Sequence, residues 1–192
     1  MHSSHVISPV ETVASGSDPL SEAVATARGE GVCGGGAVAL PTPRQNQALR
    51  FSLTEKCNFK CIFCHNEGLD PEQLRPAEDS RADQVLRDAV ASGYTDITFT
   101  GGEPLLELPR LERFLRLLGD LPRPPRVTLV TNGLLLRARA LAALKRYPGA
   151  KKIHVSLHAA EPAVHAEVTQ TASSTFRRVC QNVEGAVADG RP

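Results

Sequence analysis

Tryptophan is absent from this sequence of 192 residues, and aromatic residues make up only 4% of it. The scarcity of rings on which bases could stack argues against a platform for single-stranded nucleic acid. The 22 basic and 21 acidic residues leave a net charge of +1, which argues against a broadly basic surface for nucleic acid or anionic membranes.

Signals for membranes or export are also missing. No run approaches the ~18 consecutive apolar residues of a membrane-spanning helix, and the first residues lack the basic start and apolar stretch of a secretory signal. We therefore expect a cytoplasmic protein with neither a membrane nor a nucleic-acid partner.

The five cysteines are unevenly distributed. Cys57, Cys61 and Cys64 lie within eight residues, whereas Cys33 and Cys180 stand alone. In a chain without an export signal, such a cluster indicates metal binding rather than a disulfide. We interpret Cys33 as an isolated thiol, and Cys180, on the apolar stripe of a predicted helix, as a small buried side chain.

Two regions differ in pattern. Residues 1–47 are rich in Ser, Gly, Ala, Pro and Thr without a sustained apolar period, which is typical of a flexible leader. In residues 48–192, strand and helix periods alternate. Strands are expected at 49–54, 95–100, 127–131 and 152–158. Helices are expected from Ser80, as N-cap, to Gly93, around 111–119, at 137–146 and around 176–190. Four successive βα units predict an α/β fold with a parallel sheet.

The cysteine cluster directly follows the first predicted strand, and active sites of such folds lie at the carboxyl ends of the strands. Three thiolates on one short segment can bind three irons of an iron–sulfur cube. Such cubes normally take four cysteines, so one iron would keep an open coordination position. The alternative is zinc held by these cysteines and His65. Adjacent Cys64 and His65 are poorly placed on one tetrahedral ion, and no second Cys-x-x-Cys pair follows.

Residues 48–192 resemble the radical S-adenosylmethionine (radical SAM) superfamily, because four motifs occur in that family's order. They are the cysteine cluster, Gly101-Gly102-Glu103-Pro104, Thr131-Asn132-Gly133, and Ser156 near the end of the fourth strand. Within the superfamily, residues 49–58 and 64–68 are similar to the molybdenum-cofactor GTP 3',8-cyclases. The resemblance implies a partial (βα) TIM-like barrel, shortened here to about four βα units.

The resemblance also implies cofactors and their ligands. Cys57, Cys61 and Cys64 would bind a [4Fe–4S] cluster whose open iron takes the methionine end of SAM. One electron would cleave SAM into methionine and a 5′-deoxyadenosyl radical, which would take a hydrogen from the substrate. No side chain is assigned as an acid or base. The side chains and backbone expected to contact SAM belong to Phe63, Gly101, Gly102, Glu103, Thr131 and Ser156.

The substrate is less closely defined. Arg50 shares the polar side of the first strand with Ser52 and Thr54, would face the barrel interior, and would suit an anion such as the triphosphate of GTP. The cyclases usually carry a basic residue where this chain has Thr98, and a charged hydrogen bond contributes roughly 1.5–3 kcal/mol. Another nucleotide, a peptide or a natural-product precursor is therefore an alternative substrate. A non-catalytic metal-binding module is the alternative from another class.

The chain also departs from the family in length. The family barrel has six βα units, and the cyclases carry a second cysteine cluster near the carboxyl end, for which no cysteines remain here. We expect a fragment or a split version. The exposed fourth strand would favour self-association or a missing carboxyl-terminal partner. An electron donor such as a flavodoxin or ferredoxin is a further expected partner.

Overall fold

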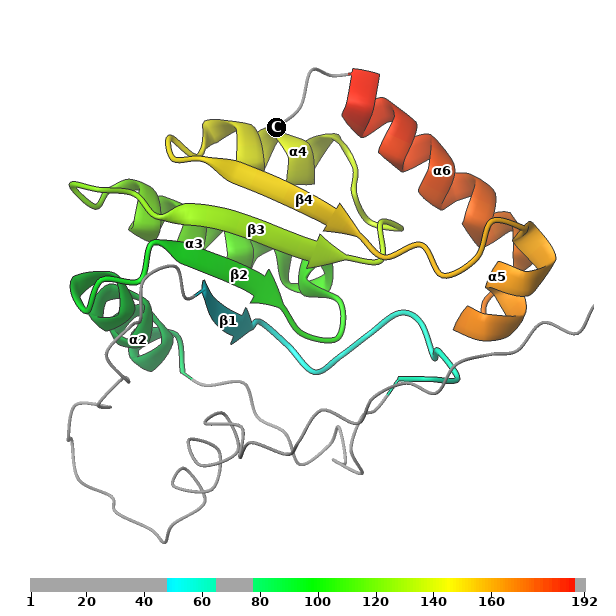
Figure 1. Cartoon of the computed structure of the whole chain (residues 1–192), viewed down its shortest axis with the longest axis horizontal. Helices are drawn as coiled ribbons and strands as arrows, with labels where there is room; N and C mark the ends of the chain where they lie inside the picture. Colours follow the sequence, from blue (N-terminus) through cyan, green and yellow to red (C-terminus); the bar gives the residue numbers. More distant parts are fainter. Residues whose placement is uncertain (1–47, 65–77, 189–192) are drawn as a thin grey trace, which may run out of the picture. The chain divides into compact units, whose positions relative to one another are not determined.

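A computed structural model describes residues 48–64 and 78–188 (Figure 1). The predicted leader, Cys33 and His65 lie outside these ranges. In the described part, four strands form one parallel sheet in the order β1-β2-β3-β4. Their bounds are Ala48–Ser52, Asp96–Thr100, Arg126–Thr131 and Lys151–Val155. The predicted α/β fold with a parallel sheet is thereby confirmed.

One face of the sheet carries the core. Alternation in β2 and β3 puts Ile97, Phe99, Val127 and Leu129 on this face, all fully buried. Three helices cover it: α2 (Asp79–Ala91), α3 (Leu108–Gly119) and α4 (Ala138–Arg146) (Figure 1). Phe114 of α3 stacks against Phe99 with ring centroids 6.2 Å apart. Each such buried side chain contributes about 1.5–3 kcal/mol, so this packing fixes the strand ends in space.

The opposite face of the sheet is more polar. The strand register places Arg50, Thr98, Thr128 and Lys152 in one row across it. Arg50 and Lys152 at the ends of the row are exposed, and the two threonines are half-buried. The sequence prediction that Arg50 lies on the side away from the apolar residues of β1 is therefore correct.

The start of α2 differs from the prediction. The helix begins at Asp79, with Glu78 in the N-cap position, so Ser80 lies inside the first turn and is not the cap. Asp79 accounts for the difference, because its carboxylate pairs with Arg110 and Arg113 of α3 at 3.0 and 2.7 Å. A negative charge at this end also suits the helix dipole.

The fourth βα unit departs further from the prediction. Strand β4 ends at Val155, and two helices follow, α5 (Pro162–Thr169) and α6 (Ser173–Ala188). Only the second was predicted. In α5 the buried residues are the polar His165 and Thr169, whereas Val164 is 44% exposed, so no apolar stripe marks this helix. A short 3₁₀ helix, η1 (Pro104–Glu107), was also not predicted.

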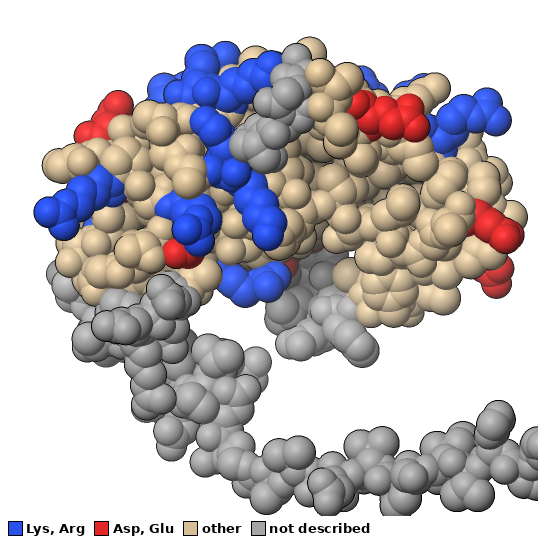
Figure 2. All heavy atoms as spheres, turned by 45° about the horizontal axis from the view of Figure 1, so that its top comes forward, with Lys and Arg blue, Asp and Glu red and all other residues tan. Residues whose placement is uncertain are grey.

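Surface charge is local in this fold. The basic residues of α4, which are Arg139, Lys145 and Arg146, and the N-cap residue Arg137 are all exposed. Figure 2 shows Lys and Arg side chains gathered on the face it presents, although the whole chain carries a net charge of only +1. In the described ranges, no helix is long and apolar enough to cross a bilayer.

Candidate functional site

The three clustered cysteines lie on a loop that leaves the carboxyl end of β1, here called the cysteine loop (residues 53–64). Its first residue, Leu53, is fully buried. The Leu53 amide donates to the Thr100 carbonyl at 2.9 Å, and the Leu53 carbonyl accepts from Arg110 Nη1 at 2.8 Å. These contacts continue the sheet one residue beyond β1 and fix the direction in which the loop leaves it.

The turn after β2 (residues 101–103, the GGE turn) packs directly against the cysteine loop. The amide of Gly102 donates to the Thr54 carbonyl at 2.7 Å, and that of Glu103 donates to the Lys56 carbonyl at 2.8 Å. A Cβ on either glycine would lie 2.3 Å from one of these carbonyl oxygens, and Gly101 has a φ of +137°. Both positions therefore need glycine to let the loop approach. Their contact with SAM stays a prediction.

The carboxylate of Glu103 joins this turn to the one after β3. It is fully buried. Its Oε1 accepts from the Leu105 amide at 2.9 Å and the Thr131 hydroxyl at 2.8 Å, and its Oε2 accepts from the Asn132 amide at 2.8 Å. Burial raises the pKa of Glu103, and the three hydrogen bonds oppose that rise. The observed role of Glu103 is thus to hold two turns together, and its predicted bond to SAM is untested.

The turn after β3 (residues 131–133, the TNG turn) reaches the cysteine loop from a second direction. Asn132 Nδ2 donates to Asn58 Oδ1 at 2.7 Å and lies 4.0 Å from the sulfur of Cys57. Thr131 is buried, and its carbonyl accepts from the Ser156 amide at 2.9 Å. Two predicted SAM contacts, Thr131 and Ser156, therefore lie beside each other at the carboxyl ends of β3 and β4.

Helix α5 holds the far side of the loop. The amides of Lys60 and Ile62 donate to the carbonyls of Thr169 and Val168 at 3.1 and 2.9 Å. The last carbonyls of a helix have no partner within the helix, so the loop supplies what α5 lacks. Phe59 packs edge-on against His165, with ring centroids 6.0 Å apart. Sequence reasoning missed this anchor because nothing in the apolar pattern indicated α5.

The thiols of Cys57, Cys61 and Cys64 are close enough for their charges to interact. Burial raises the pKa of Cys57, and the Phe59 amide, 3.4 Å from the sulfur, opposes that rise. Burial also raises the pKa of Cys61, and the charges of Cys57 and Cys64 add to the effect. Among the described residues, no three His, Cys, Asp or Glu side chains are close enough to hold a single ion.

Two rings, Phe63 and His158, pack against each other near the end of the cysteine loop. Phe63, two residues after Cys61, is 47% exposed and lies edge-on to His158 with ring centroids 4.7 Å apart. His158 lies two residues after Ser156, in the segment after β4, whereas Phe63 lies in the loop after β1. The two rings therefore come from segments that follow the two edge strands of the sheet. Sequence analysis assigned Phe63 a role toward the adenine of SAM and gave His158 none. Only the structure shows that these two rings are in contact.

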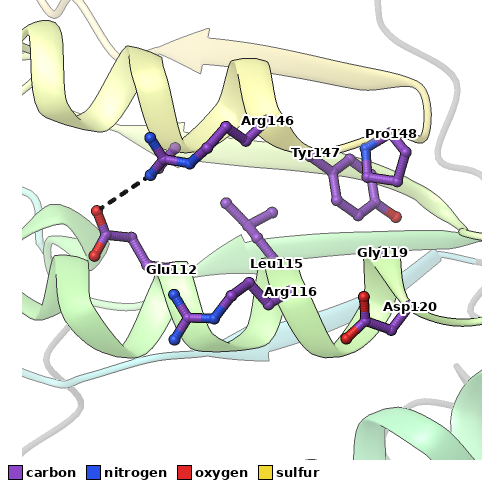
Figure 3. Close-up of a pocket in the computed structure, with 9 residues that line it drawn as sticks. Glu112, Leu115, Arg116, Gly119, Asp120, Arg146, Tyr147 and Pro148 are labelled. Carbon is purple, nitrogen blue, oxygen red and sulfur yellow. Dashed lines mark ion pairs between the residues drawn. The ribbon is translucent and has the colours of Figure 1, made fainter.

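A cavity of about 260 Å³ lies elsewhere, between α3 and α4 (Figure 3). Arg146 and Glu112 form an ion pair across it at 3.8 Å. The Tyr147 hydroxyl donates to the Pro125 carbonyl, and burial raises the pKa of Tyr147 to about 12. No predicted site residue lines this cavity, so we assign it to the packing of the outer helices.

Comparison with known proteins agrees with this geometry. Residues 51–192 match the family model described as "Radical SAM superfamily". A "Probable GTP 3',8-cyclase" of Methanosarcina mazei is 31% identical over 154 residues, which cover 78% of this chain and 44% of the relative. The "GTP 3',8-cyclase" of Pelotomaculum thermopropionicum is 37% identical over 131 residues, 66% of this chain and 39% of the relative. The chain therefore spans less than half the length of these relatives.

Solved structures show the same fold. Streptococcus suis SuiB bound to the precursor peptide SuiA superimposes with a TM-score of 0.56 at 19% identity, covering 69% of this chain and 29% of SuiB. The structure of SuiB bound to S-adenosylmethionine gives a TM-score of 0.54 at 18% identity. With the family match, this likeness leads to one assignment. The chain belongs to the radical SAM superfamily, a class of enzymes that use a [4Fe–4S] cluster and S-adenosylmethionine.

Proposed function

We propose that this chain forms the cluster-binding part of a radical SAM enzyme of the GTP 3',8-cyclase type, with Cys57, Cys61 and Cys64 as the cluster ligands. The observation that supports this most directly is the convergence of the GGE turn, the TNG turn and α5 on the cysteine loop. A loop that merely exposed three thiols would not need all three anchors. Pre-organised ligands lower the entropy lost when a cluster binds.

In this proposal, different residues bind the cluster and the two ends of SAM. The anchored loop holds three thiolates, and the backbone of the GGE turn, Thr131 and Ser156 would bind the methionine end of SAM. Phe63 would pack against its adenine. When bound, the cluster supplies the electron that cleaves SAM and starts radical chemistry on the substrate. The buried TNG turn and the buried Glu103 would keep water from one side of the reacting groups.

The proposed substrate is GTP, on the basis of the named relatives and of Arg50. Arg50 lies on the polar face of the sheet in one row with Thr98. Thr98 favours the second candidate, a radical SAM enzyme for another nucleotide, a peptide or a natural-product precursor, because a hydroxyl in this row does not neutralise a phosphate. We further propose a cytoplasmic setting, where thiols stay reduced, and a flavodoxin or ferredoxin as the electron donor.

The cluster proposal is tested by anaerobic reconstitution with iron and sulfide. We expect about four irons per chain, an EPR signal on reduction that changes when SAM is added, and formation of 5′-deoxyadenosine. Ala at Cys57, Cys61 or Cys64 should abolish cluster binding. Cys180→Ala is the matched control, because Cys180 is a thiol on α6 outside the site, and it should leave iron content unchanged. Equal iron content in all four variants, or stoichiometric zinc without a SAM effect, would refute the proposal.

A further inference from the structure

Asn132 is the one TNG-turn residue whose side chain reaches the cysteine cluster, and neither the family motifs nor the proposed SAM contacts give it a task. Its backbone is fixed, because its amide donates to buried Glu103. The side chain is nearly buried, with 8% of its surface exposed. A buried amide in a fixed place presents its donors in one direction only, which makes the orientation of that amide informative.

The hydrogen bonds of Asn132 determine that orientation. Its Oδ1 accepts from the Leu134 amide at 3.1 Å, so the carbonyl end of the side chain is turned toward the TNG turn. The NH₂ end must then face the cysteine loop. There, one N–H donates to Asn58 Oδ1 at 2.7 Å, and Nδ2 lies 4.0 Å from Cys57 Sγ.

A second N–H approaches the same sulfur. The amide of Phe59 lies 3.4 Å from Cys57 Sγ, so donors from the loop and from the TNG turn meet at one cysteine. N–H groups directed at a cysteine ligand stabilise negative charge on its sulfur. Such bonds are one of the means by which a protein sets the potential of an iron–sulfur cluster. Glu103 acts in the opposite sense, because its charge raises the pKa of Cys57.

We propose that Asn132 is a positioning residue that orients Cys57 and, through an N–H directed at its sulfur, raises the reduction potential of the bound cluster. This inference rests on the proposed function, since it requires the cluster on Cys57. It goes beyond that function in assigning a redox role to a side chain that the proposed function does not use. The reduced cluster carries one more negative charge than the oxidised form, so the donor stabilises it more.

Asn132→Asp is the first test. The aspartate can still accept from Leu134, but it loses the N–H and adds a negative charge near the sulfur. Asn132→Ser removes the side-chain amide N–H without adding charge, and the shorter serine hydroxyl can still accept from the turn. Asn182→Ala is the matched control, because Asn182 Nδ2 donates to the carbonyls of Gly133 and Leu134 at 2.9 Å, at the end of the TNG turn, and forms no bond to a cysteine within the described ranges.

The readout is an EPR-monitored redox titration of the reconstituted full chain, without substrate. At a fixed potential near the wild-type midpoint, we expect the ratio of reduced to oxidised cluster to fall about tenfold in Asn132→Asp, which corresponds to ~59 mV for one electron. Asn132→Ser should give a smaller fall of the same sign. Asn182→Ala should titrate like wild type, even if its melting temperature is lower.

The outcomes separate the two proposals. Failure of the wild-type chain to bind a cluster would refute the proposed function. A cluster with unchanged potential in both Asn132 variants would refute the redox role alone. A shift of equal size in Asn182→Ala would also refute it, because the potential would then follow the general integrity of the turn. Loss of iron from both Asn132 variants, with Asn182→Ala loaded, would assign Asn132 to holding the cluster and not to setting its potential.

Discussion

The imidazole of His165 packs between two phenyl rings, Phe59 of the cysteine loop and Phe176 of α6, at centroid distances of 6.0 and 5.5 Å. His165 is fully buried, and its Nε2 has no hydrogen-bond partner among the residues that the structure describes. Its Thr169 neighbour, one turn later, offers the carbonyl that binds the Lys60 amide. One apolar cluster thus couples α5 and α6 to the segment that carries the cysteines.

This environment predicts a pH-dependent stability. Burial, and to a smaller extent the charge of His158, lowers the pKa of His165, so this histidine takes up a proton less readily in the folded chain than in the unfolded one. An unfolded chain binds the proton near pH 6.5. The unfolded state therefore gains stability relative to the folded state as the pH falls below 6.5, and His165 adds no pH dependence well above it. Urea unfolding of the apo chain at pH 7.5 and 5.5 should show lower stability at 5.5.

His165→Phe should remove this dependence. The ring keeps its place between Phe59 and Phe176, and the unpartnered nitrogen, whose burial costs roughly 1–3 kcal/mol, disappears. We expect the variant to be more stable and to lose less stability between pH 7.5 and 5.5. His154→Phe, at an exposed position of β4, is the control and should keep the wild-type dependence. An unchanged pH dependence in His165→Phe would assign the effect to other groups.

Gly102→Ala tests the close approach of the GGE turn to the cysteine loop. The added methyl would lie 2.3 Å from the backbone oxygen of Lys56, so the loop or the turn must move. Overpacking of this kind costs typically 1–3 kcal/mol, and iron uptake should fall several-fold because the Cys57 segment moves with Lys56. Unfolding by urea and the iron content after reconstitution measure the two effects.

Gly185→Ala is the matched control for that variant. Gly185 lies in α6 with nothing within 4 Å of an added Cβ. Alanine in a helix is favoured over glycine by about 1 kcal/mol, so this variant should be more stable and should bind iron normally. Normal iron uptake by both variants would show that the close contact at Gly102 is not needed to place the cysteines.

Glu103→Gln tests the joint between the GGE and TNG turns. Each carboxylate oxygen of Glu103 accepts at least one hydrogen bond, so the NH₂ of glutamine would face a donor in either orientation. A buried polar group left unsatisfied costs roughly 1–3 kcal/mol, and we expect a loss of stability in that range. The exposed Glu184→Gln in α6 should show none. Equal urea midpoints for the two variants would show that the hydrogen bonds of Glu103 between the two turns do not stabilise the fold.

Period and motif order were enough to predict the sheet, because apolar and polar residues alternate along β2 and along residues 126–129 of β3, with Ile97, Phe99, Val127 and Leu129 buried. They also predicted which turns meet at the strand ends. Parallel strands bring their carboxyl ends to one edge, and the GGE and TNG turns contact the segment after β1, while Ser156 contacts Thr131. Local sequence pattern was sufficient where one face of an element is apolar.

The remaining features depend on partners distant in sequence. Helix α5 buries His165 and Thr169 because the cysteine loop and α6 pack on them, and no local period encodes that face. The helix α2 begins one residue before the predicted N-cap Ser80, because Asp79 pairs with arginines of α3. The tasks of Glu103 and Asn132 depend on which atoms their side chains reach, and a motif gives residue types without giving those atoms.

Thr98→Arg tests whether the polar row of the sheet can bind the triphosphate of GTP. Thr98 pairs with Arg50 on one side and Thr128 on the other, and neighbouring strands are ~4.8 Å apart, so a guanidinium at position 98 would lie beside that of Arg50. One added charged hydrogen bond contributes roughly 1.5–3 kcal/mol, which should tighten GTP binding by about 10–100-fold. Equilibrium dialysis of the reconstituted chain with labelled GTP measures the change.

Thr95→Arg is the control for this variant. It adds the same charge just before the amino end of β2, at an exposed position, and should have little effect. If Thr98→Arg leaves GTP binding unchanged, and Arg50→Ala does not weaken it, this row of side chains does not bind the triphosphate of GTP. The second candidate substrates would then be favoured.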